Sequence, residues 1–273
     1  MSATHARKKP FLRLATAAVA MVAALGMAAC SGGASTSSSS SSSAQVGDRS
    51  PEQIKEAGEI VIGIFSDKAP FGYIDADGKP AGYDVVYGDR IAADLGVTAK
   101  YVPVDAAART EVLASNKVDI TLANFTVTPE RAEKVDFANP YFKVSLGVVS
   151  PTSAEITDVS QLAGKTLIVT KGTTAEAYFE ANHPEVKLQK YDQYSDAYQA
   201  LEDGRGDAFS TDNTEVIAWA IQHPGFSVGI KSLGETSYIA AAVKKGNTAL
   251  LDWLNNQLVE LGKENFFHKA YEK

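Results

Sequence analysis

The chain has 273 residues, of which 45% are hydrophobic and 22% are charged, so it can bury the core of one or two domains. Its formal net charge of −7 becomes −11 once the four basic residues that precede Cys30 are left out. Such an acidic chain is not expected to bind nucleic acid. Its single cysteine excludes a disulfide within the chain and a cysteine-based metal site.

The first 29 residues have the pattern of a secretion signal. Basic residues between positions 7 and 13 precede an apolar stretch, residues 14–26, that is shorter than the roughly 20 residues of a membrane-spanning helix. The stretch ends in Met27-Ala28-Ala29-Cys30, which resembles a bacterial lipobox with methionine where leucine is usual. The resemblance implies cleavage before Cys30 and lipidation of that cysteine. A plain cleaved signal and a retained anchor are the alternatives.

Residues 30–50 are expected to carry the lipid on Cys30 and to form a flexible linker. Residues 31–45 are rich in serine, glycine, alanine and threonine, with seven consecutive serines at 37–43. Such a composition cannot bury enough apolar surface to order itself. We therefore expect the globular part to begin near residue 51.

Strand and helix patterns then alternate in two series. The first has expected strands at 59–64, 98–103 and 118–122, and expected helices at 84–95, which a cap-like Asp84 would open, and 107–115. The second has expected strands at 167–169, 187–191 and 208–210, and expected helices at 174–182, 195–202 and 214–222. A strand at 238–243 and helices at 248–261 and 264–270 complete the chain. This order predicts the α/β class, with parallel sheets covered by helices.

The stretch at residues 123–131, Ala-Asn-Phe-Thr-Val-Thr-Pro-Glu-Arg, is the clearest signal of a site. It follows the strand expected at 118–122, whose alternating apolar and polar residues predict that it is half-buried. Thr128 suits an N-cap and Pro129 suits the first helical position. Arg131 would then lie in the first turn of a helix, where the macrodipole disfavours a cation, so we expect an anion beside it. The junction between a strand and a helix is also where open α/β sheets bind ligands.

Together with Asp-Phe-Ala-Asn-Pro-Tyr at residues 136–141, this stretch resembles the signature of the family 3 solute-binding proteins, the polar amino-acid receptors of bacterial ABC importers. The resemblance runs from about residue 59 to the C-terminus. It implies a two-lobed periplasmic-binding-protein fold of type II, with two parallel-type sheets joined by a two-strand hinge near 141–145 and 235–239. The implied lobes are residues 51–142 plus 239–273, and residues 143–238.

The resemblance also implies how lobe 1 would hold an amino acid. Arg131 corresponds to the arginine that grips the α-carboxylate, and Thr126 to the residue that joins it. Asn124 has a position whose backbone carbonyl usually accepts from the ammonium group. The structural alternative for Arg131 is a surface arginine paired with Glu130 or Asp136.

In lobe 2, Gly172-Thr173-Thr174 matches the family's second carboxylate contact, at a helix start that suits an anion. Asp212 matches the aspartate that accepts the ligand's ammonium group. The alternative is that Thr173 and Asp212 only cap the helices that follow them. A zwitterion that contacts both lobes would favour the closed state.

The ligand's side chain is less well defined. Arg109 matches an arginine of acidic amino-acid receptors, but the cysteine-binding subgroup carries it too, and residues 65–73, 171–179, 212–214 and 266–271 resemble that subgroup. Arg109 could equally be a solvated helix residue, and Phe65 could belong to the core. The expected ligand-binding residues are Phe65, Lys68, Arg109, Asn124, Phe125, Thr126, Arg131, Thr173, Thr174 and Asp212.

The resemblance therefore implies a monomeric receptor, lipid-anchored on the extracellular face of the cell membrane. It would bind a polar L-amino acid, first of all cysteine, and deliver it to an ABC permease without a cofactor or metal. The alternatives are a glutamate or aspartate receptor, or an enzyme similar to cyclohexadienyl dehydratases. With Arg131 and Asp212 assigned to the zwitterion, no spare acid or base is clearly placed for such an enzyme.

Overall fold

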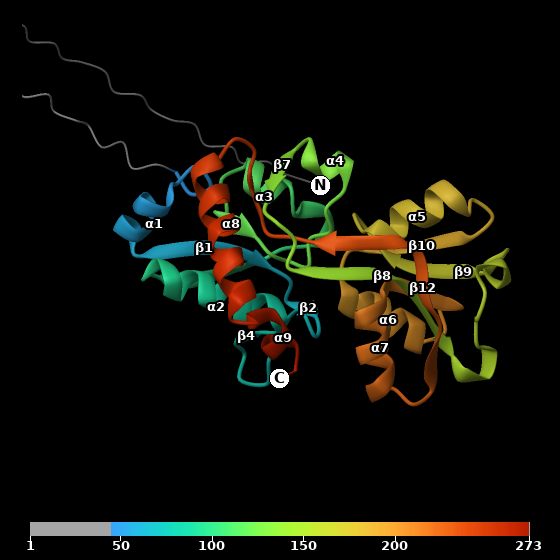
Figure 1. Cartoon of the computed structure of the whole chain (residues 1–273). Helices are drawn as coiled ribbons and strands as arrows, with labels where there is room; N and C mark the ends of the chain where they lie inside the picture. The colour runs from blue at the N-terminus through green and yellow to red at the C-terminus, as the bar shows by residue number, and fades with distance from the viewer. Residues whose placement is uncertain (1–44, 273) are drawn as a thin grey trace, which may run out of the picture. The chain divides into compact units, whose positions relative to one another are not determined.

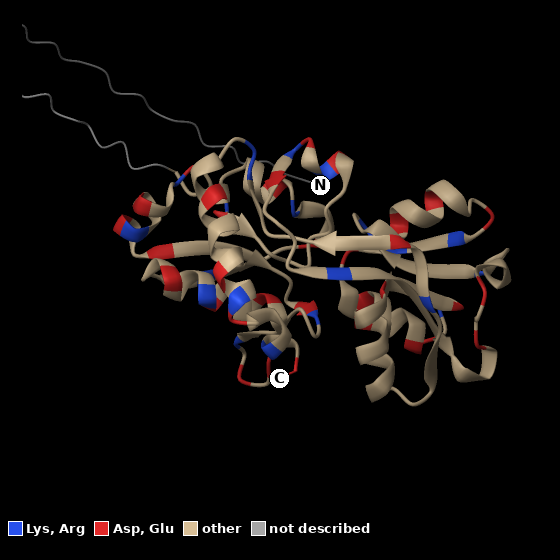
Figure 2. Ribbon diagram, viewed as in Figure 1, with Lys and Arg blue, Asp and Glu red and all other residues tan. Residues whose placement is uncertain are grey.

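A computed structural model describes residues 45–272 of the chain (Figure 1). The expected signal peptide, the lipidated Cys30 and most of the expected linker lie outside these residues. Within the part described, no helix combines the length and the apolar character that a membrane span requires. Acidic and basic side chains are intermixed along the ribbon (Figure 2).

The first sheet has the strand order β5-β1-β6-β13-β7 and is flanked by helices. β1 is parallel to β5 and β6, whereas β13 is antiparallel to β6 and β7. Its strands are β1 (Glu59–Ile64), β5 (Thr98–Pro103), β6 (Ile120–Thr121), β7 (Val135–Phe137) and β13 (Ala242–Lys244). Its helices are α1 (Pro51–Ala57), α2 (Tyr83–Leu95), α3 (Glu111–Ala114), α4 (Pro129–Ala132), α8 (Thr248–Lys263) and α9 (Phe266–Tyr271). We call this part lobe 1.

The second sheet has the order β10-β9-β11-β8-β12, and we call the part built on it lobe 2. β9 is parallel to β10 and β11, and β8 is antiparallel to β11 and β12. Its strands are β8 (Phe142–Pro151), β9 (Thr166–Thr170), β10 (Lys187–Tyr191), β11 (Ala208–Asp212) and β12 (Phe226–Ile239). Its helices are α5 (Thr174–Asn182), α6 (Tyr194–Glu202), α7 (Asn213–Gln222) and the 3-10 turns Thr152–Ala154 and Val159–Leu162.

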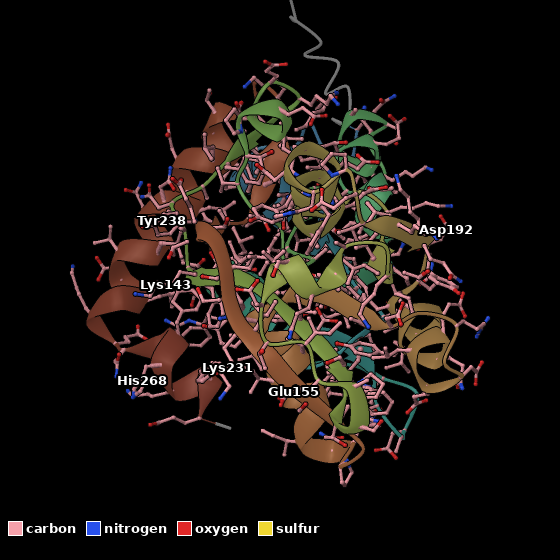
Figure 3. All side chains as sticks on the ribbon, turned by 90° about the vertical axis from the view of Figure 1, so that its right-hand side faces the viewer. Lys143, Glu155, Asp192, Lys231, Tyr238 and His268 are labelled. Atoms are coloured by element: carbon pink, nitrogen blue, oxygen red, sulfur yellow. The ribbon has the colours of Figure 1, made fainter. Side chains whose placement is uncertain are left out.

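Two long strands connect the lobes, which confirms the expected fold class. The chain leaves β7 along β8 and returns to β13 along β12. Lys143 and Tyr238 pair across these strands close to lobe 1, and Figure 3 shows both side chains. The crossing points lie near the positions expected for the hinge, while the residue bounds of the two lobes stay a prediction.

A third, small sheet was not expected from the sequence. It consists of β2 (Asp67–Lys68), β3 (Gly72–Ile74) and β4 (Pro80–Ala81), in that order. Strands of two or three residues are too short for a periodic pattern. Gly82, with φ +113°, follows the sheet, and a Cβ atom there would lie 2.4 Å from the carbonyl oxygen of Phe71. Glycine is therefore required where the two backbones meet.

Three expected elements differ in the structure. Residues 107–115 are not one helix but the 3-10 turn Ala106–Ala108 followed by α3. Residues 118–122 are buried on both faces instead of half-buried, because β1 and β13 flank β6 and helices cover the sheet. The expected strand at 238–243 is interrupted between β12 and β13, because these two strands belong to different sheets.

The end of the expected linker is packed against lobe 1. Arg49 and Asp119 are both buried, and Arg49 Nε donates to Asp119 Oδ1 at 2.9 Å. The same carboxylate accepts from the backbone N–H groups of Gly47 (3.0 Å) and Val61 (2.8 Å). Ser50 then forms a capping box with Gln53 and starts α1. The expectation of a flexible chain up to residue 50 is therefore wrong for residues 46–50, because a buried carboxylate needs these donors.

Replacing Arg49 by methionine is expected to lower the free energy of unfolding by about 3 kcal/mol, because it leaves the Asp119 carboxylate buried without a countercharge. Urea unfolding followed by circular dichroism measures this loss. Arg205→Met is the matched control, since Arg205 pairs with Asp203 on the exposed surface at 2.8 Å and should change stability by less than about 1 kcal/mol. Equal effects of the two substitutions would show that the Arg49–Asp119 pair has no special role.

Candidate functional site

A small pocket lies where the two lobes meet. Its volume is about 10 Å³. The lining contains six of the ten expected site residues and three others: Arg109, Asn124, Thr126, Thr173, Thr174 and Asp212, with Ala175, Tyr194 and Thr211. We call it the inner pocket. Phe65, Lys68, Phe125 and Arg131 do not line it.

The turn after β6 places Asn124 in the inner pocket. Ala123 and Asn124 have left-handed backbone angles, φ +33° and +41°. The Asp84 carboxylate holds this turn, since its Oδ2 accepts from the N–H of Asn124 at 2.7 Å and its Oδ1 accepts from the hydroxyl of Tyr141 at 2.7 Å. Burial raises the pKa of Asp84 to about 6, although both hydrogen bonds oppose that rise. The expected capping role of Asp84 is wrong, because Gly82 has the N-cap position of α2.

Asp212 lies at the end of β11, on the opposite wall. It has the N-cap position of α7, but its side chain makes no capping hydrogen bond, which rules out the capping alternative here. Its Oδ2 instead accepts from Nδ2 of Asn124 at 2.5 Å. Thr173 does cap α5, since its hydroxyl accepts from the N–H of Glu176 at 3.2 Å and donates to the carbonyl of Thr170 at 2.6 Å.

Arg131 lies in the first turn of α4, as the sequence predicts, and its backbone N–H donates to Oγ1 of Thr128 at 3.2 Å. Because α4 has only four residues, a macrodipole has little influence here. Nη1 of Arg131 donates to the carbonyl of Thr126 at 2.7 Å, and Nη2 donates to the carbonyl of Gly172 at 2.8 Å. The arginine lines a larger outer cavity of about 570 Å³, which shares Arg109, Thr173 and Thr174 with the inner pocket.

The alternative partners proposed for Arg131 are engaged elsewhere. Glu130 pairs with Lys134 at 3.3 Å, and Asp136 pairs with Lys245 at 2.7 Å. Among the residues that the structure describes, no carboxylate forms an ion pair with Arg131. The reading of Arg131 as a surface arginine paired with these neighbours is therefore wrong.

Arg109 is buried, and main-chain carbonyls hold its guanidinium group. Nε donates to Ala106 at 2.9 Å, Nη1 to Ala123 at 3.2 Å and to Asn124 at 3.1 Å, and Nη2 to Gly172 at 3.1 Å. The residue is thus not a solvated helix residue. The carbonyl of Asn124, which we expected to accept from a ligand's ammonium group, already accepts from Arg109.

Both arginines sit in surroundings that disfavour their charge. Burial lowers the pKa of Arg109, and burial together with the nearby Arg109 cation lowers the pKa of Arg131 to about 9. The two guanidinium groups share the carbonyl of Gly172, and each lies over the ring of Phe125, at 4.6 Å for Arg109 and 5.1 Å for Arg131. A ligand that brings a carboxylate would supply the countercharge these groups lack.

Lys68 is 1% exposed, and its ammonium group contacts residues of lobe 2. Nζ pairs with the Glu215 carboxylate, donates to Oγ1 of Thr211 at 3.1 Å and lies 3.6 Å from Oδ2 of Asp212. Burial is the largest single influence and alone would lower the pKa of Lys68, but Glu215, Tyr194 and Asp212 together raise the pKa above its ordinary range. Sequence reasoning missed Glu215, because nothing local marks a helical glutamate as the partner of a lysine far away in the chain.

Phe65 and Phe125 are buried and pack against residues of the site. Phe65 is buried and packs edge-on against Tyr194 at 5.3 Å, so it belongs to the core, as one of its two expected roles allowed. Phe125 is buried under both guanidinium groups and also lines the outer cavity. Tyr194 also lines the inner pocket.

Two helix-flanked sheets, joined by two crossing strands and facing each other across a polar pocket, define a two-lobed binding protein of the type II periplasmic-binding-protein fold. The chain belongs to the bacterial extracellular solute-binding proteins, family 3, whose model matches residues 60–273. The expected family and fold are therefore confirmed.

Three relatives illustrate the similarity. The solute receptor for L-cysteine of Neisseria gonorrhoeae is 51% identical in sequence over 82% of this chain and 92% of that one, and its crystal structure matches with a TM-score of 0.80. The cysteine-binding protein from Campylobacter jejuni is 52% identical, with a TM-score of 0.80, over 81% and 91%. The ABC transporter glutamine-binding protein GlnH of Bacillus subtilis is 28% identical over 225 residues, 81% of this chain and 82% of that protein.

Proposed function

We propose that this protein is a non-enzymatic receptor that binds a free L-amino acid, first of all L-cysteine, between its lobes and delivers it to an ABC transporter permease. The observation that carries the proposal is a pair of arginines, the buried Arg109 and the partly buried Arg131, which form no ion pair with a carboxylate of residues 45–272 and lie close to Asp212 on the other lobe. A zwitterion offers its carboxylate to the arginines and its ammonium group to Asp212. The family and the two cysteine-binding neighbours support the same assignment.

In this proposal Arg131 is the main carboxylate contact, and Thr126, Thr174 and the start of α5 add hydrogen bonds. Because Arg131 now donates to Gly172 and lines the outer cavity, its guanidinium group would exchange the carbonyl of Gly172 for the ligand's carboxylate. Asp212 would accept from the ammonium group. Since the ligand would contact both lobes, its binding would favour the closed arrangement that a permease recognises.

The geometry of Arg109 favours cysteine over glutamate or aspartate. Four hydrogen bonds to main-chain carbonyls hold its guanidinium group, so it is poorly available for a side-chain carboxylate. This geometry suits a ligand side chain without charge.

A thermal-shift screen of the full chain, with Cys30→Ser to remove its thiol, tests the proposal. A ligand that binds only the folded state stabilises it by about 2.7 kcal/mol when its concentration is a hundred times Kd. We expect the largest rise in melting temperature with L-cysteine and smaller rises with L-glutamate and L-aspartate. No rise with any amino acid would refute the receptor assignment. Turnover of prephenate or arogenate would instead favour the dehydratase-like alternative.

We also propose that a lipid on Cys30 tethers the receptor to the outside of the cell membrane. Cys30→Ser in the full chain is expected to move the protein from the membrane fraction to the soluble fraction after cell fractionation, because two or more acyl chains are needed for stable anchoring and all would be lost. Immunoblotting of the two fractions gives the result. A variant that stays in the membrane fraction would show that the anchor is not this lipid.

A further inference from the structure

We propose that β2 is a latch that holds the two lobes together through contacts in which the bound amino acid takes no part. β2 belongs to lobe 1 and consists of Asp67 and Lys68. Each of these residues makes its polar side-chain contacts with lobe 2. The proposal does not depend on which solute the protein binds.

The Lys68 half of the latch is a buried ion pair across the lobes. Its partner Glu215, on α7, is 0% exposed. The Glu215 carboxylate also accepts from Oγ1 of Thr211 at 2.8 Å and from the hydroxyl of Tyr198 at 3.2 Å. The ring of Tyr194 lies 4.0 Å from Nζ of Lys68 and covers the ammonium group. Because Glu215 and Asp212, the two carboxylates that pair with Lys68, both belong to lobe 2, separating the lobes breaks these ion pairs.

The Asp67 half completes a helix of the other lobe. α6 begins at Tyr194, and its N-cap residue, Gln193, makes no side-chain capping bond. Oδ2 of Asp67 accepts from the N–H of Ser195 at 3.0 Å and from its hydroxyl at 3.3 Å. Asp67 thus satisfies from lobe 1 one of the free N–H groups at the start of α6.

β2 is fixed to lobe 1, as a latch requires. Asp67 pairs with Tyr73 and Lys68 with Gly72 in the small sheet. A Cβ atom on Gly72 would lie 2.7 Å from the carbonyl oxygen of Phe65, so β3 lies close against the backbone that leads into β2. Whether β2 makes its side-chain contacts therefore depends on the position of lobe 2 relative to lobe 1.

This role replaces the ligand contact that the sequence suggested for Lys68. The residue does not line the inner pocket, and its ammonium group is directed to Glu215, Thr211 and one edge of Asp212. Lys68 is therefore a positioning residue. It acts on ligand binding through the closed arrangement and by holding Asp212.

The test measures the separation of the lobes without any amino acid. Spin labels on Lys134→Cys and Glu180→Cys, in the full chain carrying Cys30→Ser, lie on exposed residues of opposite lobes that line the outer cavity. Pulsed electron-resonance distances then give the ratio of closed to open molecules. Lys68→Met is expected to lower this ratio by about 30-fold or more, because closure would bury Glu215 without its partner. Asp67→Asn should lower it to a smaller extent.

Two further variants make the result specific. Adding Glu215→Gln to Lys68→Met should recover most of the closed molecules, because no unpaired charge is then buried. Lys263→Met is the control, since Lys263 pairs with Glu260 on the exposed surface at 2.7 Å, and it should leave the distances unchanged. The proposal is overturned if Lys68→Met leaves the ratio unchanged, if the double variant is as open as Lys68→Met, or if the labelled parent chain is wholly open. A failure of the amino-acid screen would not affect this measurement.

Discussion

Replacing Arg131 by alanine is expected to weaken binding of the amino acid by about 100-fold or more, with little change in the melting temperature of the protein measured without amino acid. Two hydrogen bonds from a guanidinium group to a carboxylate contribute roughly 1.5–3 kcal/mol each, and 1.4 kcal/mol corresponds to a factor of ten in Kd. The fold itself loses only the bonds to the carbonyls of Thr126 and Gly172, at a side chain that is not fully buried. Isothermal titration and thermal unfolding measure the two quantities.

Lys134→Ala is the matched control for this substitution. Lys134 follows Arg131 by three residues, lines the same outer cavity and pairs with Glu130 at an exposed position. Removing this second cation should leave Kd within about two-fold, because a surface pair of this kind contributes little. If Arg131→Ala lowered the melting temperature strongly and left Kd unchanged, the arginine would be a structural residue and the proposed carboxylate contact would be wrong.

Asp212→Asn is expected to weaken amino-acid binding by about 30-fold or more. The substitution preserves the shape of the side chain and one acceptor, but it removes the charge that would face the ammonium group, and the loss of one partner from a buried charge pair costs about 2–5 kcal/mol. Asp192→Asn is the control, since Asp192 pairs with Lys171 on the exposed surface of lobe 2 at 2.9 Å.

A cysteine analogue without the amino group, 3-mercaptopropionate, separates the role of Asp212 in binding from a general effect on the site. This analogue should bind weakly to the parent protein, because nothing in it pairs with the Asp212 carboxylate. It should not lose further affinity in Asp212→Asn. An equal loss of affinity for cysteine and for the analogue would mean that Asp212 shapes the pocket without contacting the ammonium group.

The elements that the sequence predicts best are those with a local cause. The helix at 174–182 and the strand at 187–191 have the expected bounds, and Thr128 and Pro129 open α4 as their backbone preferences require. Elements that depend on partners are less predictable. Residues 238–243 form one apolar run, but only the pairing of strands decides that the run is divided between two sheets.

The same division applies to the site. The family resemblance predicted that Arg109, Asn124, Thr126, Thr173, Thr174 and Asp212 contact the ligand, and all six line one pocket in the structure. It did not reveal that Arg109 is held by main-chain carbonyls, or that Lys68 is directed into lobe 2. A side chain's partner depends on which distant residue the fold brings within hydrogen-bonding distance.

The sequence by itself therefore determined the α/β class, the family and most of the residues around the pocket, because these follow from periodicity, from capping chemistry and from a specific motif. Only the tertiary structure decided the pairs Arg49–Asp119 and Lys68–Glu215, whose members lie 70 and 147 residues apart. It also decided that the Asp84 carboxylate holds the turn at Asn124 instead of capping its own helix. Burial is the physical reason, because a charge removed from water must find its partner wherever the fold provides one.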